Sequence, residues 1–204
     1  FLALFYFHRG TFDDAESYRG LKEKFNATDK EWGMCSNKLF YLAVAPEYYE
    51  GILSNLSSSG LTDPCGEGEG WTRVIVEKPF GIDLETAKTV DLLLGKLFKE
   101  EQIYRIDHYL AKEMLQNILA FRFSNDIFEN IWSNKFIESI DIRLWETLDL
   151  KTRGAFYDGI GAFRDVGQNH LLQMLAFIAM ERPKSFGAGD VRNARTDLLQ
   201  TLSV

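Results

Sequence analysis

Residues 73–83 read Arg73-Val74-Ile75-Val76-Glu77-Lys78-Pro79-Phe80-Gly81-Ile82-Asp83. The first four are mainly apolar and have the length of a short strand. Pro79 and Gly81 are typical of a turn, and Asp83 can cap a helix that follows. That helix is expected to hold near one face its apolar residues Leu84, Val90, Leu94 and Leu97. The stretch therefore predicts a strand, a turn and a helix in immediate succession.

The same order occurs once before in the chain. Leu39–Val44 is an apolar run of strand length, and Glu47–Leu56 follows it with a helical pattern. A further helix is expected to run from Thr11, as its capping residue, to about Phe25. Strands that alternate with helices predict a parallel sheet that helices cover on both faces. The first half of the chain is thus expected to be α/β.

The pattern changes in the second half of the chain. From Phe136 to Leu144, polar and apolar residues alternate, which predicts a half-solvated antiparallel strand. Residues 161–180 return to a helical pattern, with an apolar stripe formed by Leu171, Met174, Leu175 and Ile178. We therefore expect a domain change near Asp107, with an α/β domain over residues 1–107 and an α+β domain over residues 108–204.

Composition and charge limit the possible functions. The 204 residues are 46% hydrophobic, and 23 basic against 30 acidic side chains give a net charge of −7, which argues against a nucleic-acid partner. The longest mainly apolar stretch, Leu171–Met180, has about half the length that a bilayer requires, so no membrane partner is expected. The chain begins at Phe1 without a methionine and stops within an apolar pattern, so we expect it to be cut at both ends.

The chain contains two cysteines, Cys35 and Cys65. They form no CxxC motif and lack the spacing of metal ligands. The sequence therefore predicts two free thiols, a reducing cytoplasm and no metal site.

A first polar cluster surrounds His108. His108 and Lys112 are four residues apart, so on one helical turn they would share a face, with the Tyr109 hydroxyl nearby. These groups and the positive end of a helix could bind a phosphate dianion. The alternative is a solvated helix start with ordinary charges.

A second polar cluster ends at His170, at the edge of the apolar stripe. A histidine there is usually a hydrogen-bonded core residue. To act as a general base it would need an orienting carboxylate, and Asp107, near the expected domain boundary, is the candidate. Asp165 fits direct pairing less well on an α-helical wheel, and it could instead accept protons from substrate hydroxyls.

Lys78 is the third candidate, because ligands of parallel sheets bind at the carboxyl ends of strands. It could bind a substrate or a cofactor, whereas the alternative is a lysine that merely extends from a strand end. The glycine-rich residues 66–70 are acidic and precede a strand, so they are expected to form a surface turn and no dinucleotide loop.

Together the three segments resemble the glucose-6-phosphate dehydrogenase family. The family signature, R-I-D-H-Y-L-G-K-E, corresponds here to Arg105–Glu113, and a preceding strand ends in E-K-P-F-G. The resemblance continues through residues 37–43, 125–132 and 153–158 to residues 168–173, and covers nearly the whole chain. Ala111 replaces the usual signature glycine, and Gly167 stands where bulkier residues are common. The family's N-terminal glycine loop and roughly its C-terminal half are not matched, so the resemblance implies an internal fragment.

The resemblance implies a role for each candidate residue. His170 would be the catalytic base and Asp107 would hold its imidazole. The implied substrate contacts are Lys78, His108, Tyr109, Lys112, Glu146 and Asp165, and the implied cofactor contacts are Lys78, Tyr49 and Pro46. For Tyr49, the alternative is a tyrosine that packs a helix.

The implied fold is a partial Rossmann-type parallel sheet followed by the start of a β+α domain with a large antiparallel sheet. The implied activity is oxidation of glucose 6-phosphate at C1 to 6-phosphogluconolactone, with hydride transfer to NADP or, less in keeping with the family, NAD. This is the first step of the pentose phosphate pathway, carried out in the cytoplasm by a homodimer or homotetramer. The isolated chain is expected to be inactive.

Two other interpretations remain open. Other Rossmann-type sugar oxidoreductases also carry E-K-P after a strand, although they lack the D-H-Y-L-x-K-E segment. A fragment or paralogue that binds sugar phosphate without catalysis is the second alternative.

Overall fold

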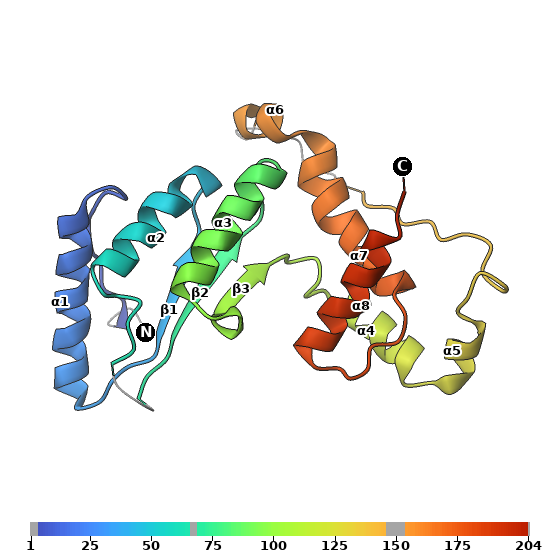
Figure 1. Ribbon diagram of the computed structural model, residues 1–204, viewed down its shortest axis with the longest axis horizontal. Coiled ribbons are helices and arrows are strands. Elements are labelled where there is room, and N and C mark those ends of the chain that lie inside the picture. Colours follow the sequence, from blue (N-terminus) through green and yellow to red (C-terminus); the bar gives the residue numbers. More distant parts are fainter. Residues whose placement is uncertain (1–3, 66–68, 146–153, 204) are drawn as a thin grey trace. The chain divides into compact units, whose positions relative to one another are not determined.

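The computed structural model describes residues 4–65, 69–145 and 154–203 (Figure 1). The chain divides into two compact units, Phe1–Ile106 and Asp107–Val204, and each is described by itself. Of the sequence candidates, Glu146 lies outside the described residues.

The first unit is built on a parallel sheet of three strands, in the order β1-β2-β3 (Figure 1). The strands are β1 (Lys38–Leu42), β2 (Thr72–Glu77) and β3 (Ile103–Ile106). Phe40 pairs with Val74, and Glu77 pairs with Ile106. The parallel arrangement confirms the expectation from alternating strands and helices. The sequence pattern does not predict β3, because its four residues include Tyr104 and Arg105 and so do not form a continuous apolar run.

Within the described residues of this unit, three α-helices accompany the sheet: α1 (Ala15–Trp32), α2 (Tyr49–Ser58) and α3 (Leu84–Leu97). Two short 3₁₀ turns, η2 (Pro46–Tyr48) and η3 (Glu100–Gln102), precede α2 and β3. The expected start of α1 is wrong: Asp14, not Thr11, caps it, because its side chain accepts from the Glu16 N–H at 3.1 Å. Asp83 caps α3 as expected, since it accepts from the Thr86 N–H at 2.8 Å.

The core of the first unit lies on one face of the sheet, where Tyr49, Leu53, Val74 and Val76 are fully buried. α1 reaches the same core through Phe25, whose ring packs against Phe40 of β1. The expectation that helices cover both faces is wrong for the described residues. The alternate side chains of the strands, including Leu39, Tyr41 and Tyr104, stay exposed because the described helices pack on the opposite face.

In the described residues of the second unit, the regular elements are helical (Figure 1). They are α4 (Glu113–Phe123), α5 (Asp126–Ile131), α6 (Gly154–Ala162), the π-helix η5 (Phe163–Leu171), α7 (Leu172–Ala179) and α8 (Ala188–Gln200). α7 packs against both α4 and α8. Their shared core contains Phe123, Phe177 and Met180.

The strand expected over residues 136–144 is not formed. Residues 133–136 make a turn, and residues 137–145 have no regular structure. A strand requires a partner to bond its backbone groups, and the described part of this unit contains no second strand. The alternating pattern of residues 136–144 is therefore not enough to form a hydrogen-bonded strand pair.

No helix among the described residues has both the length and the apolar character that a membrane crossing demands.

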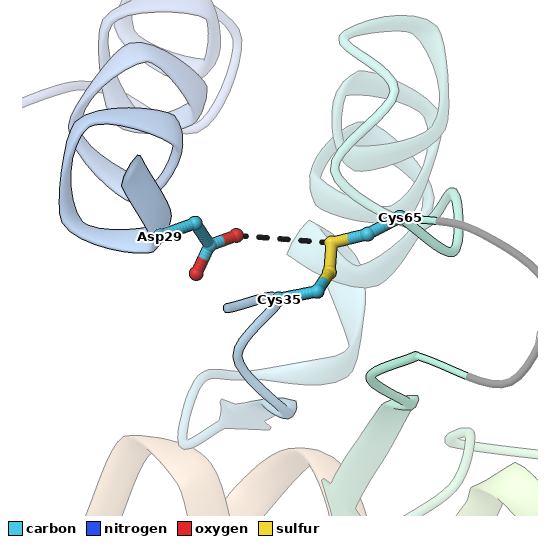
Figure 2. Close-up of side chains that lie close together, drawn as sticks. All are labelled: Asp29, Cys35 and Cys65. Carbon is cyan, nitrogen blue, oxygen red and sulfur yellow. Dashed lines mark hydrogen bonds between the residues drawn. A yellow bond between two sulfur atoms is a disulfide. The ribbon is translucent and has the colours of Figure 1, made fainter. Parts of the chain in front are cut away.

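The two cysteines lie together in the structure, and their sulfurs form a disulfide between Cys35 and Cys65 (Figure 2). Their Cα atoms are 6.1 Å apart, within the range of about 4.4–6.8 Å that disulfides require. The prediction of two free thiols is therefore wrong for this structure. The cysteines are 30 residues apart in the sequence, and the parallel pairing of β1 with β2 helps to bring their segments together.

Arg122 joins α4 to the end of α7. Its buried guanidinium donates to the carbonyls of Phe177, Ile178 and Met180 at 3.3, 2.7 and 3.0 Å. These carbonyls lie at a helix end, where they lack partners within the helix. One cationic side chain thus satisfies several backbone acceptors at once.

We expect Arg122→Met to destabilise the second unit strongly. Methionine keeps apolar contact but removes charged hydrogen bonds worth about 1.5–3 kcal/mol each, so the loss should exceed about 3 kcal/mol. The melting temperature should fall by at least about 6 °C in a thermal unfolding experiment. Arg143→Met is the control, because Arg143 is mostly exposed and forms an ion pair at the surface with Asp141. Equal, small losses in the two variants would contradict this role of Arg122.

Candidate active site

The second unit brings Asp107 and His170 together from positions 63 residues apart. The His170 Nδ1 lies 2.7 Å from the Asp107 Oδ1. Both side chains are withdrawn from solvent, with exposed fractions of 2% for His170 and 9% for Asp107. A hydrogen bond shielded in this way fixes the orientation of the imidazole ring.

The turn after β3 positions the carboxylate. The Tyr109 N–H donates to the Asp107 Oδ1 at 3.0 Å, and the Leu110 N–H donates to the Asp107 carbonyl at 3.0 Å. The Asp107 side chain is therefore held by its own turn as well as by His170. Its second oxygen, Oδ2, is buried and has no hydrogen-bond partner among the described residues.

Aromatic and basic side chains surround this pair. The Tyr109 ring lies 4.0 Å from the His170 ring at an interplanar angle of 32°, and the exposed His108 meets His170 edge-on at 5.2 Å. The Lys112 Nζ lies 3.7 Å from the centre of the Tyr109 ring. His108, Tyr109 and Lys112 thus gather beside the Asp107–His170 pair.

The local geometry of this segment differs from the expected single helical turn. Residues 108–111 form a turn, closed by the Lys112 N–H donating to the Tyr109 carbonyl at 3.1 Å, and α4 begins only at Glu113. Ala111 lies within this turn. Lys112 occupies the capping position of α4, where its charge adds to the positive end of the helix. His108 and Lys112 therefore each contact the Tyr109 ring, without sharing the face of one helix.

His170 comes from the π-helix η5, whereas the sequence pattern predicts an ordinary α-helix there. A π-helix hydrogen-bonds residues five apart, so Asp165 and His170 lie one turn from each other. On an α-helical wheel the same two residues point in different directions. The half-buried Asp165 is thus closer to the His170 side of its helix than the sequence analysis expects.

Arg195 is a neighbour that the sequence analysis missed. It extends from α8, bonds to the Gln173 amide oxygen and lies 4.5 Å from the centre of the Phe177 ring. Burial lowers the pKa of the Arg195 guanidinium, the Asp107 carboxylate raises it, and the net shift is downward. An arginine on an amphipathic helix gives no sign in the sequence that it lies near a buried carboxylate.

The remaining candidates belong to the first unit. Lys78 is half-buried and follows β2, the central strand, with a cis peptide bond to Pro79. The fully buried Tyr49 donates from its hydroxyl to the Glu77 carbonyl at 3.0 Å, one residue before Lys78. Pro46 is half-buried at the start of η2.

The Asp107–His170 pair is suited to accept a proton on the imidazole, next to the Asp107 carboxylate. A neutral imidazole that donates through Nδ1 to a carboxylate can accept a proton at Nε2, and the carboxylate then stabilises the imidazolium. Asp107, His108 and His170 could also be considered as metal ligands, since their ligand atoms lie within 4.8 Å of one another. The Nδ1 of His170 is already engaged by Asp107, which favours the acid–base arrangement.

Comparisons with known proteins agree on one family. A model described as glucose-6-phosphate dehydrogenase, NAD binding domain, matches residues 1–117, and one described as glucose-6-phosphate dehydrogenase, C-terminal domain, matches residues 119–204. Glucose-6-phosphate 1-dehydrogenase of Chlamydia pneumoniae is 40% identical over 97% of this chain and 39% of its own length. Glucose-6-phosphate 1-dehydrogenase 2 of Mycobacterium tuberculosis is 46% identical over 89% of this chain and 35% of its own length.

Solved structures give the same result. A glucose-6-phosphate dehydrogenase in complex with its substrate glucose-6-phosphate matches 96% of this chain with a TM-score of 0.85 and 38% identity. Glucose-6-phosphate 1-dehydrogenase from Mycobacterium avium matches 95% with a TM-score of 0.78 and 36% identity. The chain covers 40% of each of these two structures and a similar share of the curated relatives.

Proposed function

Because this chain belongs to the glucose-6-phosphate dehydrogenase family, we propose that the protein containing it oxidises glucose 6-phosphate at C1 to 6-phosphogluconolactone, the first step of the pentose phosphate pathway. The observation that carries the proposal is the buried hydrogen bond between His170 and Asp107. Oxidation of an alcohol requires a base for its proton, and an oriented imidazole performs that task near neutral pH.

His170 is the proposed base. Asp107 engages Nδ1, so Nε2 accepts the proton of the C1 hydroxyl. As the imidazole becomes charged, the adjacent carboxylate stabilises it within a poorly solvated environment. The Tyr109 N–H and His170 both hold Oδ1, which keeps the carboxylate in one orientation during this step.

The phosphate of the substrate is assigned to Lys112, His108 and Tyr109. Lys112 stands at the positive end of α4, and both Lys112 and the exposed His108 contact the Tyr109 ring. Cationic and hydroxyl donors at a helix start suit a phosphate dianion. Asp165, one π-helical turn from His170, and Glu146 are proposed to accept from sugar hydroxyls, and Lys78 to contact the sugar as well.

NADP is the proposed cofactor, with NAD as the alternative. The residues fit a dinucleotide because Lys78 supplies a cation at the carboxyl end of a parallel strand, where such ligands bind. When bound, the cofactor accepts the hydride that leaves C1. Lys78 and Pro46 are proposed to contact it. Tyr49 holds the Glu77 carbonyl and would thus line the cofactor site chiefly by fixing the backbone before Lys78.

The proposal also includes the cellular location, the oligomeric state and the partners of the protein. We place it in the cytoplasm as a homodimer or homotetramer, without nucleic-acid or membrane partners. A net charge of −7 without a basic cluster supports the absence of nucleic acid.

The test is an assay of the complete protein with glucose 6-phosphate, following formation of NADPH or NADH. We expect turnover that requires the phosphate ester and that is lost in His170→Asn. Turnover with a different sugar at equal efficiency would favour another Rossmann-type oxidoreductase. Binding of glucose 6-phosphate without any reduction of NADP or NAD would favour the non-catalytic alternative.

A further inference from the structure

A second side-chain cluster lies at the amino end of the sheet, where β1 and β2 begin. Figure 2 shows three of its members: Asp29 of α1, Cys35 between α1 and β1, and Cys65 in the loop between α2 and β2. The fourth is Lys38 of β1, whose ammonium contacts Asp29 and Cys65. We call these four residues the cysteine cluster. The residues proposed for catalysis and binding do not include them, and the two cysteines already stand at bonding distance.

The two cysteines differ in their access to solvent. Cys65 is exposed and Cys35 is half-buried. An external thiol therefore reaches Cys65 first. Exposed disulfides are also the ones that exchange most readily, whereas buried disulfides resist reduction.

A buried cation stands beside the accessible sulfur. The Lys38 Nζ lies 3.4 Å from the Cys65 Sγ and 3.0 Å from the Asp29 Oδ2, and the Lys38 side chain is only 11% exposed. A lysine ammonium next to sulfur stabilises the thiolate, which is the form that reacts and that leaves. Asp29 is fixed in turn by the Ser36 N–H at 3.0 Å, so the cation has a defined position.

The cluster resembles a partial metal site, because ligand atoms of Asp29, Cys35 and Cys65 lie within 4.8 Å of one another. The Lys38 ammonium approaches two of these ligand atoms and would repel a divalent cation. The charge arrangement therefore favours thiolate chemistry over metal binding.

We propose that Cys35 and Cys65 form a reversible redox site that exchanges electrons with a dithiol, such as the paired cysteines of a disulfide reductase. In a reducing compartment, the location proposed above, disulfides are typically transient or sensory, which suits an accessible pair of this kind. In the disulfide form the Cys65 Sγ lies 3.7 Å from the Asp29 Oδ2, so the exposed sulfur stands beside the Asp29–Lys38 ion pair (Figure 2).

The exchange follows the exposure of the two sulfurs. A thiolate of the reductant attacks the Cys65 Sγ, the disulfide breaks, and Cys35 leaves as a thiolate that takes a proton from water. The second thiol of the reductant then attacks the mixed disulfide, and Cys65 leaves as a thiolate beside Lys38. The reductant becomes a disulfide and has given two electrons to the protein. Oxidation retraces the same steps.

The disulfide matters for stability because it closes a long loop. The loop contains β1 and α2, and its two ends are 30 positions apart in the sequence. Closing a loop of this length restricts the unfolded chain, so reduction should make the first unit easier to unfold.

The experiment equilibrates the complete protein in mixtures of reduced and oxidised dithiothreitol, traps thiols with a maleimide and locates them by mass spectrometry. We expect both cysteines to convert together and reversibly under native conditions. The oxidised form should melt about 5–15 °C higher than the reduced form. Cys35→Ser combined with Cys65→Ser should abolish this difference between the two buffers.

Lys38→Met tests the role of the cation. The second step, in which Cys65 leaves the mixed disulfide, should become about tenfold slower, because the Cys65 thiolate loses the charge that stabilises it. Lys88→Met, at an exposed lysine of α3, is the control and should leave the rate unchanged. If Lys38→Met does not fold, the titration of the unaltered protein still decides the proposal.

Three results would overturn the proposal. The thiols could stay reduced at every ratio, or the disulfide could resist reduction until the protein is denatured. Alternatively, the reduced pair could bind Zn²⁺ stoichiometrically when the metal alone is added. These measurements need no dehydrogenase activity, so their failure leaves the proposed reaction untouched.

Discussion

Replacing His170 by asparagine should lower kcat for glucose 6-phosphate by about 10²–10⁴-fold, the usual loss when a general base is removed. Asparagine keeps an amide donor that can face Asp107, so the buried carboxylate retains a partner. Affinity for glucose 6-phosphate should stay nearly unchanged. Steady-state kinetics of the complete protein, together with thermal unfolding, separate these effects.

His108→Asn is the matched control for this experiment. His108 meets the His170 ring edge-on but is exposed, and the bond to Asp107 belongs to His170. The control should change KM more than kcat, as expected for a residue that binds phosphate. If folded His170→Asn had a normal kcat and a much lower melting temperature, His170 would stabilise the core and would not act as the base.

Asp107→Asn tests whether the pair acts as one unit. This change removes the charge that stabilises the imidazolium and disturbs the orientation of the ring, so kcat should also fall. The double variant should be scarcely slower than His170→Asn alone, because Asp107 acts through His170. Fully multiplicative losses would show that the two residues act independently.

Local signals in the sequence explain why the first unit was largely predictable. The order of strand, turn and helix around Lys78 depends on neighbours in the chain, and the cap at Asp83 needs only Thr86, three residues later. The start of α1 was misplaced because Thr11 and Asp14 are both acceptable caps, and only the backbone geometry selects Asp14. The sequence does not predict the short strand β3, because β3 is stabilised by its pairing with β2 and not by a local pattern.

The site depended on features that a sequence does not reveal. A buried histidine needs a partner, which made Asp107 a reasonable candidate for His170. The π-helix that carries His170 is not predictable, since a segment of nine residues is too short to reveal a wider helical period. Likewise, the approach of Arg195 to Asp107 and the meeting of Cys35 with Cys65 arise from tertiary packing.

The phosphate site gives the second large expected effect. Lys112→Ala should raise KM for glucose 6-phosphate by about 10- to 150-fold, because a charged hydrogen bond is worth about 1.5–3 kcal/mol. Lys112 stands at the start of α4 and takes no part in the bond between His170 and Asp107, so kcat at saturating substrate should change little. Initial rates over a range of glucose 6-phosphate concentrations measure both parameters.

Glucose distinguishes a phosphate contact from a general loss of structure. Glucose lacks the phosphate, so its much weaker oxidation should respond little to Lys112→Ala, whereas a disturbed site would impair both substrates. Lys135→Ala, at another exposed lysine of the second unit, should leave both reactions unchanged. Lys112→Arg should recover part of the affinity, since arginine keeps the charge but changes its geometry. Equal losses on glucose and glucose 6-phosphate would show that Lys112 does not bind the phosphate. The contact of Lys112 with the Tyr109 ring would then be its only assigned role.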